Sequence, residues 1–318
     1  WRAGFTVVAS WIPGSVADYQ DPEIARGKTR ELVKVMGNTQ KLLADDAVHF
    51  LEDPSLRERP FFLWLAFTAP HIPLEPNSPE SRALYAGKTS ADLLPPGFPK
   101  GIPTNDFRHY SEAVSDLDAQ VARVVAALEH SGLATNTTIL FLGDNGHLMG
   151  DRGIGAEGVK GKIVPYEGSV RVPMILAGPG VAAKMSDLAA SSLDVPPTLL
   201  ALAGVSVPQK WPGRNLLGAE GALDDAFLEW ADEVDDRWQP FRAVRTSGAR
   251  RSHKLIVWKD PKKPLELYDL IADPAEAKNL ASQPEALKLR ADLMMRLKRW
   301  LDRTGDSARG WGTIQALK

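Results

Sequence analysis

The sequence of 318 residues contains no cysteine. This absence excludes disulfide bonds, thiolate metal sites and a cysteine nucleophile among these residues, although it does not fix the redox compartment. Long apolar runs are also missing, since the longest, residues 61–67, is far shorter than the ~20 residues that cross a bilayer. An excess of basic charge is missing too: 38 Lys and Arg face 40 Asp and Glu, and this balance argues against a nucleic-acid partner.

What is present is an apolar fraction of 44% over a length sufficient for two domains, which predicts buried cores. Helical spacing of apolar residues predicts helices over 29–51 and 110–128. Three apolar runs, 61–67, 137–142 and 172–177, predict buried strands. Strands and helices in this order predict an α/β fold with a mostly parallel central sheet flanked by helices. Such sheets bind ligands at the carboxyl ends of their strands.

The pattern changes at about Ala219. Four short segments alternate apolar and polar residues and predict a smaller antiparallel sheet: 226–230, 241–246, 253–258 and 265–270. Apolar residues at helical spacing then predict a final helix from Pro284 to Leu301. We therefore expect an α/β domain over residues 1–218 and a small α+β subdomain over residues 219–318.

Asp144 and Asn145 follow the predicted strand 137–142 directly and are flanked by glycines. A carboxylate and a carboxamide at a strand end offer the hard oxygen ligands that Ca²⁺ or Mg²⁺ prefers. The same four residues, Gly-Asp-Asn-Gly, are also typical of an ordinary turn.

His71 follows the predicted strand 61–67 and is bracketed by Pro70 and Pro73, which restrict the backbone around it. A rigidly held imidazole at a strand end is a candidate for proton transfer to a leaving group. The alternative is a histidine that hydrogen-bonds a loop carbonyl.

Lys162 lies in a glycine-containing stretch that leads to the predicted strand 172–177, so its ammonium could reach an anionic substrate oxygen. Lys160 is a second candidate for this role, and either lysine could instead be a solvated surface charge. Glu167 and Arg171 are four residues apart, and we expect them to pair with each other.

Taken together, these segments resemble a known family. Five blocks match, in order, signature blocks of the sulfatases of the alkaline phosphatase superfamily: PFFLWLAFTAPHIPL, LGDNGHLMGD, GKIVPYEGSVRVPMILAGPG, SLDVPPTLLALAG and ELYDLIADPAEAKNLA. The resemblance extends from about Gly27 to the last predicted helix, which is nearly the whole chain. It implies an alkaline-phosphatase-like fold and the hydrolysis of sulfate esters.

The resemblance also implies a cofactor and residue roles. Sulfatases use a formylglycine, made from Cys or Ser, together with a divalent cation, usually Ca²⁺. By motif, Asp144 and Asn145 resemble two of the four protein ligands of the metal, while His71 and Lys162 resemble the catalytic pair at the leaving-group and sulfate oxygens. His147, beside the metal loop, is a further candidate for substrate binding. The metal-loop and YEG blocks look more like those of glycan-acting members, so the implied substrate is a small-molecule or glycan sulfate ester.

The sequence departs from the family before the first long predicted helix, where the family has its nucleophile motif, its first aspartate pair and a further Lys and His. Nothing in it matches the nucleophile motif C/S-x-P-S-R, so it resembles the carboxyl-terminal portion of a sulfatase without the nucleophile segment. We therefore expect no nucleophile in this chain and no hydrolysis by this chain alone. The two-sided apolar strands also predict an exposed sheet edge and self-association through it. The first residues lack a signal-peptide pattern, so the location is open, with the periplasm or secretion as the leading expectation.

Two other interpretations remain open, and a third is disfavoured. The same superfamily could supply a phosphodiester or phosphonate hydrolase, because similar metal sites act on phosphoryl groups. A sulfatase-like fold that has lost its nucleophile could be a non-catalytic binding protein. A nucleotide-binding α/β domain is disfavoured, because no glycine-rich phosphate loop follows a predicted strand.

Overall fold

The computed structural model describes residues 19–25, 31–75, 77–95, 98, 105–154, 161–218, 225–230, 239–248 and 252–316. The chain forms two compact units. The amino-terminal unit comprises residues 1–141 and 175–180, and the carboxyl-terminal unit comprises residues 142–174 and 181–318. The predicted domain boundary near Gly218 stays a prediction.

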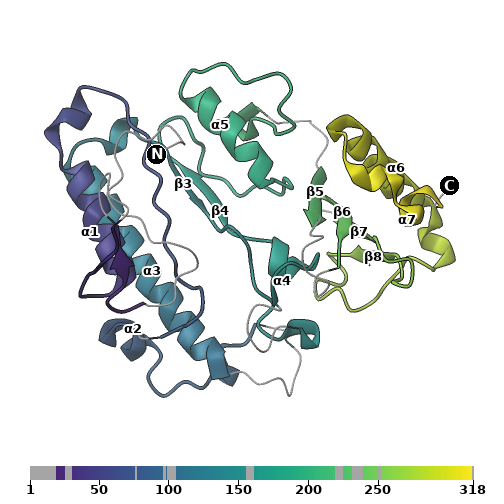
Figure 1. Ribbon diagram of the computed structural model, residues 1–318, viewed down its shortest axis with the longest axis horizontal. Coiled ribbons are helices and arrows are strands. Elements are labelled where there is room, and N and C mark those ends of the chain that lie inside the picture. Colours follow the sequence, from purple (N-terminus) through teal and green to yellow (C-terminus); the bar gives the residue numbers. More distant parts are fainter. Residues whose placement is uncertain are drawn as a thin grey trace. The chain divides into compact units, whose positions relative to one another are not determined.

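Helices α1 (Thr39–Leu51) and α3 (Asn105–His130) pack side by side in the amino-terminal unit (Figure 1). The prediction of a helix over 29–51 is wrong at its start, because the Asn38 side chain accepts the Gln40 and Lys41 N–H groups and begins α1 there. Helix α3 confirms the predicted helix 110–128 and extends it at both ends. The remaining elements before β3 are short: β1 (Glu23–Ile24), β2 (Val33–Lys34), η1 (Pro54–Arg57), α2 (Pro79–Leu84), η2 (Ser90–Leu93) and η3 (Ala134–Asn136).

Residues 61–67 do not form the predicted central strand. The segment is extended, with Phe61 and Leu63 packed against the α1–α3 pair, while Phe62 and Trp64 are 57% and 69% exposed. A strand requires a hydrogen-bonded neighbour, and no described segment pairs with this one. Self-association through an exposed sheet edge stays a prediction.

Strands β3 (Ile139–Leu142) and β4 (Met174–Ala177) pair with each other alone, and no parallel central sheet occurs among the described residues. The Gly143 N–H, just after β3, donates to the Pro173 carbonyl, just before β4, at 3.2 Å. Gly178, just after β4, approaches Thr137 and Thr138, just before β3. The two strands therefore run in opposite directions, and the prediction of a mostly parallel sheet is wrong for this pair.

The predicted antiparallel sheet and final helix are confirmed in the carboxyl-terminal unit. The sheet has the order β5-β6-β7-β8 with antiparallel pairing throughout. Its strands are β5 (Asp225–Trp230), β6 (Phe241–Thr246), β7 (His253–Trp258) and β8 (Glu266–Asp269). The helices and turns of this unit are η4 (Asp151–Gly153), α4 (Glu167–Val170), η6 (Ser192–Asp194), α5 (Val195–Leu202), η7 (Leu216–Gly218), η8 (Pro284–Ala286), α6 (Leu287–Thr304), η9 (Ser307–Gly310) and α7 (Gly312–Gln315).

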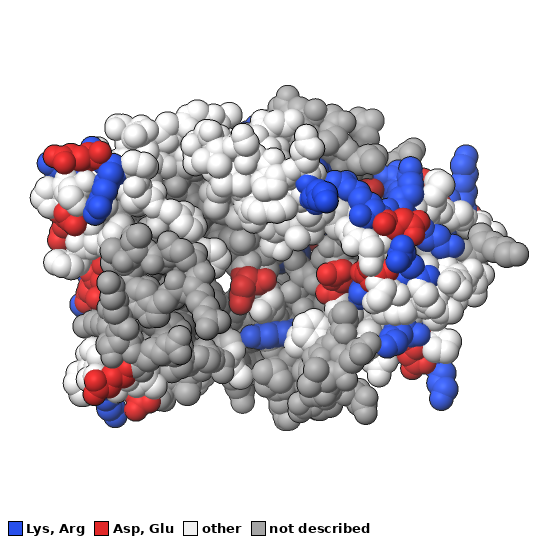
Figure 2. All heavy atoms as spheres, turned by 45° about the horizontal axis from the view of Figure 1, so that its top comes forward, with Lys and Arg blue, Asp and Glu red and all other residues white. Residues whose placement is uncertain are grey.

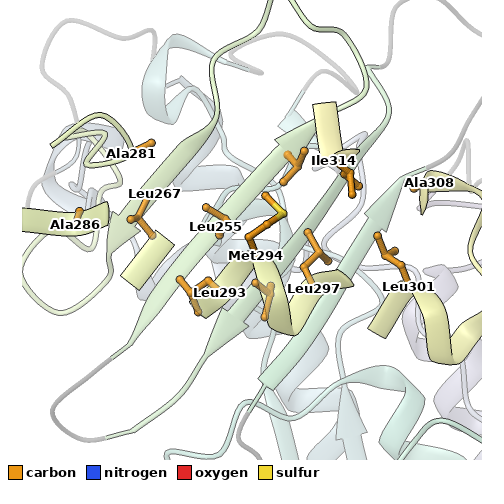
Figure 3. Close-up of a cluster of buried hydrophobic side chains, with 12 residues drawn as sticks. Leu255, Leu267, Ala281, Ala286, Leu293, Met294, Leu297, Leu301, Ala308 and Ile314 are labelled. Atoms are coloured by element: carbon orange, nitrogen blue, oxygen red, sulfur yellow. The ribbon is translucent and has the colours of Figure 1, made fainter. Parts of the chain in front are cut away.

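One face of this sheet packs on α6 (Figure 3). Leu255, Val257 and Leu267 alternate along β7 and β8 and meet Leu293 and Leu297 of the helix. This alternation follows from the period of two in a strand, which sends successive side chains to opposite faces. The buried side of α6 is therefore the one that its sequence spacing predicts.

The opposite face of the sheet is covered by loops of the same unit. Ile256 and Tyr268 lie in a buried cluster that includes Leu148 and Tyr166. Leu148 follows the Asp144–Asn145 turn, and Tyr166 follows Lys162 by four residues. The sheet thus supports two of the segments that the sequence marks as functional.

The surface charges are mixed in sign. Figure 2 shows Lys and Arg side chains interspersed with Asp and Glu on the face drawn, in keeping with the formal net charge of −2. No described helix is both long enough and apolar enough to span a bilayer.

Candidate functional site

Asp144 and Asn145 form an exposed turn immediately after β3. One oxygen of Asp144, Oδ1, accepts the Asn145 N–H at 2.7 Å, and the Asn145 Nδ2 donates to the Gly146 carbonyl at 2.9 Å. These bonds fix both side chains and leave the second carboxylate oxygen and the amide oxygen as acceptors. The turn is therefore held by local hydrogen bonds, and its two exposed residues still offer side-chain oxygen atoms to a ligand.

The loop that carries Lys162 is fastened to this turn by backbone hydrogen bonds. The Gly146 N–H donates to the Ser169 carbonyl at 2.8 Å, and the Leu148 N–H donates to the Gly161 carbonyl at 3.0 Å. The turn at residues 143–149 and the loop at residues 161–170 therefore lie side by side within the carboxyl-terminal unit. The structure thus brings together the segments that hold four candidates, Asp144, Asn145, His147 and Lys162.

His147 packs against the backbone of Gly161, where a Cβ atom would collide with the imidazole ring. Its Nδ1 accepts the Met149 N–H at 2.9 Å. Because Nδ1 acts as an acceptor, the proton of the neutral ring lies on Nε2. In the neutral ring, Nε2 is therefore the nitrogen that donates.

Lys162 is half-buried in the loop next to Gly161. It lies directly beside the residue on which the His147 ring packs. The second lysine candidate, Lys160, lies outside the described residues.

His71 belongs to the amino-terminal unit, where its position is fixed by several bonds. Its N–H donates to Thr68, and its carbonyl accepts the buried Tyr19 hydroxyl at 2.5 Å. The His71 Nδ1 lies 2.5 Å from the Ile72 carbonyl and must be the donor, because a carbonyl oxygen carries no proton. The loop-carbonyl interaction anticipated from the sequence is therefore present, and it leaves Nε2 as the nitrogen that can exchange a proton with a substrate.

Gln40 of α1 supports the loop that leads to His71. Its side chain is buried, donates to the Thr68 Oγ1 at 2.5 Å and accepts the N–H groups of Thr68 and Ala69. Sequence reasoning missed this residue, since a glutamine within an amphipathic helix gives no signal of its contacts. The convergence of His71 with the carboxyl-terminal candidates stays a prediction.

Sequence reasoning also missed a buried charge cluster behind the Lys162 loop. The prediction that Glu167 pairs with Arg171 is wrong, because Glu167 pairs with Lys254 at 2.6 Å and with Arg245 at 3.2 Å. Burial opposes ionisation of Glu167, but the two cations outweigh it and hold its pKa below the usual value. These partners are far from Glu167 along the chain, so no local spacing reveals them.

Tyr166, beside Glu167, is held in the same region. The guanidinium of Arg152 lies 4.0 Å from the centre of its ring, and its hydroxyl donates to Glu266 at 3.2 Å. Burial and the neighbouring Glu266 raise the pKa of Tyr166 to about 12. Its phenol therefore stays protonated at neutral pH and acts as an anchor.

Gly146→Ala is expected to disrupt the contact between the turn and the Lys162 loop. A Cβ at position 146 would overlap the carbonyl oxygen of Gly168, and neither backbone can yield cheaply. We expect a loss of about 1–3 kcal/mol in the free energy of unfolding, measured by urea denaturation. Gly310→Ala is the matched control, because nothing lies within 4 Å of a Cβ there. An equal effect of the two substitutions would contradict the packing described.

The donors at the turn suit a divalent cation. Asp144 supplies a carboxylate and Asn145 an amide oxygen, which are the oxygen types that Ca²⁺ prefers. No cluster of three or more His, Cys, Asp or Glu residues suited to a metal occurs within the described part of the chain. The chemistry of Asp144 and Asn145 fits a divalent cation, and whether they bind one stays a prediction.

Known structures resemble the fold described above. The structure associated with the metabolism of multiple glycosaminoglycans by Bacteroides thetaiotaomicron superposes with a TM-score of 0.81 at 22% identity, covering 95% of this chain and 66% of that one. The crystal structure of a putative sulfatase from Bacteroides fragilis superposes with a TM-score of 0.76 at 25% identity, covering 95% of this chain and 66% of that one. These likenesses define the class of fold as that of the sulfatases.

Sequence comparison then gives the family. The Sulfatase profile matches residues 3–205, and the profile of the N-sulphoglucosamine sulphohydrolase carboxyl-terminal region matches residues 155–303. Because the first match covers more than half of the chain, the protein belongs to the sulfatase family.

Two curated relatives illustrate the similarity. The choline-sulfatase of Rhizobium meliloti is 28% identical over 88% of this chain and 62% of its own length. The Delta 4,5-hexuronate-2-O-sulfatase of Bacteroides thetaiotaomicron is 31% identical over 64% of this chain and 42% of its own. The chain therefore spans less than two thirds of the length of either relative.

The expectation that the chain lacks the amino-terminal portion of the family is not supported by these matches. The Sulfatase profile already matches from residue 3, so it includes the amino-terminal region of this chain. The resemblance to the sulfatases is confirmed, whereas truncation and inactivity are not shown.

Proposed function

We propose that the protein containing this chain hydrolyses sulfate monoesters. The observation that supports this most strongly is the fastening of the Asp144–Asn145 turn to the Lys162 loop by two backbone hydrogen bonds. Oxygen atoms that could bind a cation therefore lie on one loop. An ammonium and an imidazole N–H group that could bind an anion lie on this loop and its neighbour. A sulfate monoester needs both kinds of stabilisation, because negative charge develops on its bridging oxygen as the ester bond breaks.

Each candidate takes a role that its chemistry allows. Asp144 and Asn145 would hold Ca²⁺, with Mg²⁺ as a possible substitute, and a bound cation would neutralise charge on the sulfate oxygens. Lys162 would contact a sulfate oxygen through its ammonium, and the His147 Nε2–H would donate to another. His71, when protonated, would deliver the proton on its Nε2 to the leaving-group oxygen.

We propose a glycan sulfate as the leading substrate class, with small-molecule sulfate esters as the alternative. Support comes from the glycan-type appearance of the metal-loop and YEG blocks and from the relative named a hexuronate-2-O-sulfatase. Substrate choice depends on the shape of loops such as 73–103 and 146–159, parts of which lie outside the described residues.

The test compares matched esters with one enzyme. The longest gene product that contains this chain is assayed with an aryl sulfate, a sulfated disaccharide, and the corresponding phosphate monoester and diester. We expect turnover of the sulfate esters that is lost on chelation and restored by Ca²⁺. Preference for the phosphodiester would favour the phosphoryl-transfer alternative, and binding without turnover would favour a non-catalytic protein.

The chain of 318 residues serves as a parallel sample in this assay. It contains no match to C/S-x-P-S-R, so we propose that it does not turn over sulfate esters alone. Hydrolysis of an aryl sulfate by this purified polypeptide, with background enzyme excluded, would contradict that statement.

A further inference from the structure

A fully buried lysine lies behind the Lys162 loop. Lys254 of β7 is 0% exposed and points to the loop-covered face of the sheet, the same face as Ile256. Its ammonium donates to the Pro165 carbonyl at 2.9 Å and pairs with Glu167 at 2.6 Å and Glu276 at 2.9 Å. All three hydrogens of this ammonium therefore have acceptors.

Glu276 completes the link between the sheet and the loop. Its Oε2 accepts the Glu167 backbone N–H at 2.7 Å, while its Oε1 accepts from Lys254. The side chain is 2% exposed, and its own backbone carbonyl accepts from the Arg152 guanidinium. Glu276 is thus held from both sides and presents one oxygen to the amino end of α4.

The cluster is balanced in charge. Two carboxylates, Glu167 and Glu276, face two cations, Lys254 and Arg245. Burying these groups is costly unless each is paired, so removal of any one leaves an uncompensated charge. A cluster of this kind fixes the loop backbone, since Pro165 and Glu167 can bond in this way only at one position.

We propose that Glu276, oriented by Lys254, is a positioning residue for the anion site: it holds the backbone at Glu167 and thereby places Lys162 beside the Asp144–Asn145 turn. This inference rests on the proposed role of Lys162. The same loop accepts the two hydrogen bonds that come from the turn, through the Gly161 and Ser169 carbonyls. A displacement at Glu167 would therefore reach both the lysine and the turn.

The test uses two variants that affect the stability of the protein and the position of the Lys162 loop differently. Lys254→Met with Glu276→Met removes both members of a buried pair and keeps the charge balanced, so stability should return close to wild type. The Glu167 N–H then has no carboxylate to bond. Glu276→Gln instead keeps an acceptor oxygen for that N–H but leaves the two cations facing one carboxylate, so stability should fall.

Two readouts follow the loop. Amide hydrogen exchange of residues 166–169 should quicken by about tenfold in the double variant, the effect of one lost charge-assisted hydrogen bond, and by less in Glu276→Gln. Acetylation of Lys162, read by mass spectrometry, should be slowed by sodium sulfate relative to sodium chloride in wild type, and this protection should vanish in the double variant. Glu285→Gln, at an exposed carboxylate of η8, should change neither readout.

In the longest gene product, the double variant should lower kcat for sulfate esters by about tenfold or more, with a smaller change in KM, because a misplaced group mainly affects the transition state. The proposal would be overturned if the double variant, with its stability restored, also showed wild-type amide exchange, sulfate protection and kcat. The cluster would then have a purely structural role. Absence of sulfate protection in wild type would instead count against the proposed function, while the exchange measurement would still decide on Glu276.

Discussion

Asp144→Ala lowers kcat/KM for sulfate esters by about a hundred- to a thousandfold in the longest gene product that contains this chain, if the proposed cation site is correct. The carboxylate is the only charged donor at the turn among the described residues, so its removal should weaken Ca²⁺ binding most. Steady-state kinetics and calorimetric titration with Ca²⁺ measure the two effects.

A second substitution separates charge from turn structure. Asp144→Asn keeps an oxygen to accept the Asn145 N–H but removes the negative charge, so the fold should be preserved while Ca²⁺ affinity falls. Asp118→Ala, at an exposed position of α3, is the control and should leave both measurements unchanged. Wild-type Ca²⁺ affinity and activity in Asp144→Asn would remove Asp144 from the proposed site.

Lys254→Met destabilises the carboxyl-terminal unit by about 3–5 kcal/mol at neutral pH, because it leaves two buried carboxylates with one cation. Urea denaturation gives this value, and Lys288→Met, at an exposed position of α6, is the control with an expected change near zero. A loss below about 1 kcal/mol, the usual value of an exposed ion pair, would show that the cluster is not a buried one.

The pH dependence of this effect has a definite sign. In wild type the pKa of Glu167 lies below its usual 4.5, since Lys254 and Arg245 outweigh burial, so its stabilising contribution is present above pH 4.5 and is lost as pH falls through the lower folded-state pKa. Burial, only partly offset by Lys254, raises the pKa of Glu276, so the contribution from its protonation is present below pH 4.5 and is lost as pH rises through the folded-state pKa.

Without Lys254, the pKa of Glu167 should rise from its lowered value and that of Glu276 should rise further, because burial is then less opposed. The destabilisation by Lys254→Met should therefore be largest near pH 7 and shrink as pH approaches 4.5, where the carboxylates can take up protons. An equal loss in the free energy of unfolding at pH 7 and at pH 4.5 would show that protonation of Glu167 and Glu276 does not compensate for the missing Lys254 ammonium. Should Lys254→Met fail to fold, the variant with Glu276→Met in addition is expected to restore folding, because it removes both members of the buried pair.

The spacing of apolar residues in the sequence predicted the strands and the helix that bury an apolar face within one unit. The four strands after residue 219 and helix α6 appear where apolar alternation and helical spacing place them, because each buries an apolar side within one unit. The start of α1 was missed although the signal was present: Gly37 has φ 127° and Asn38 caps the helix. The apolar run 61–67 misled for a physical reason, since hydrophobicity predicts burial but not the neighbour that a strand must bond.

Part of the candidate site could also be predicted from the sequence, and part could not. Strand-end reasoning selected Asp144 and Asn145, and the glycine-containing stretch before the predicted strand 172–177 suggested Lys162. The structure joins the two loops that carry these residues, although β3 and β4 are antiparallel. The supporting groups could not be predicted, because Glu276 meets the Glu167 N–H across a separation of 109 residues. Buried charge clusters of this kind depend on tertiary packing, which no local pattern encodes.

The four-stranded sheet has both faces covered, by α6 on one side and by the segments of Leu148 and Tyr166 on the other. A substitution that loosens α6 would therefore also weaken the support of the loop that carries Lys162. Inherited or engineered changes near the end of this polypeptide should accordingly be screened for lost turnover as well as for poor yield.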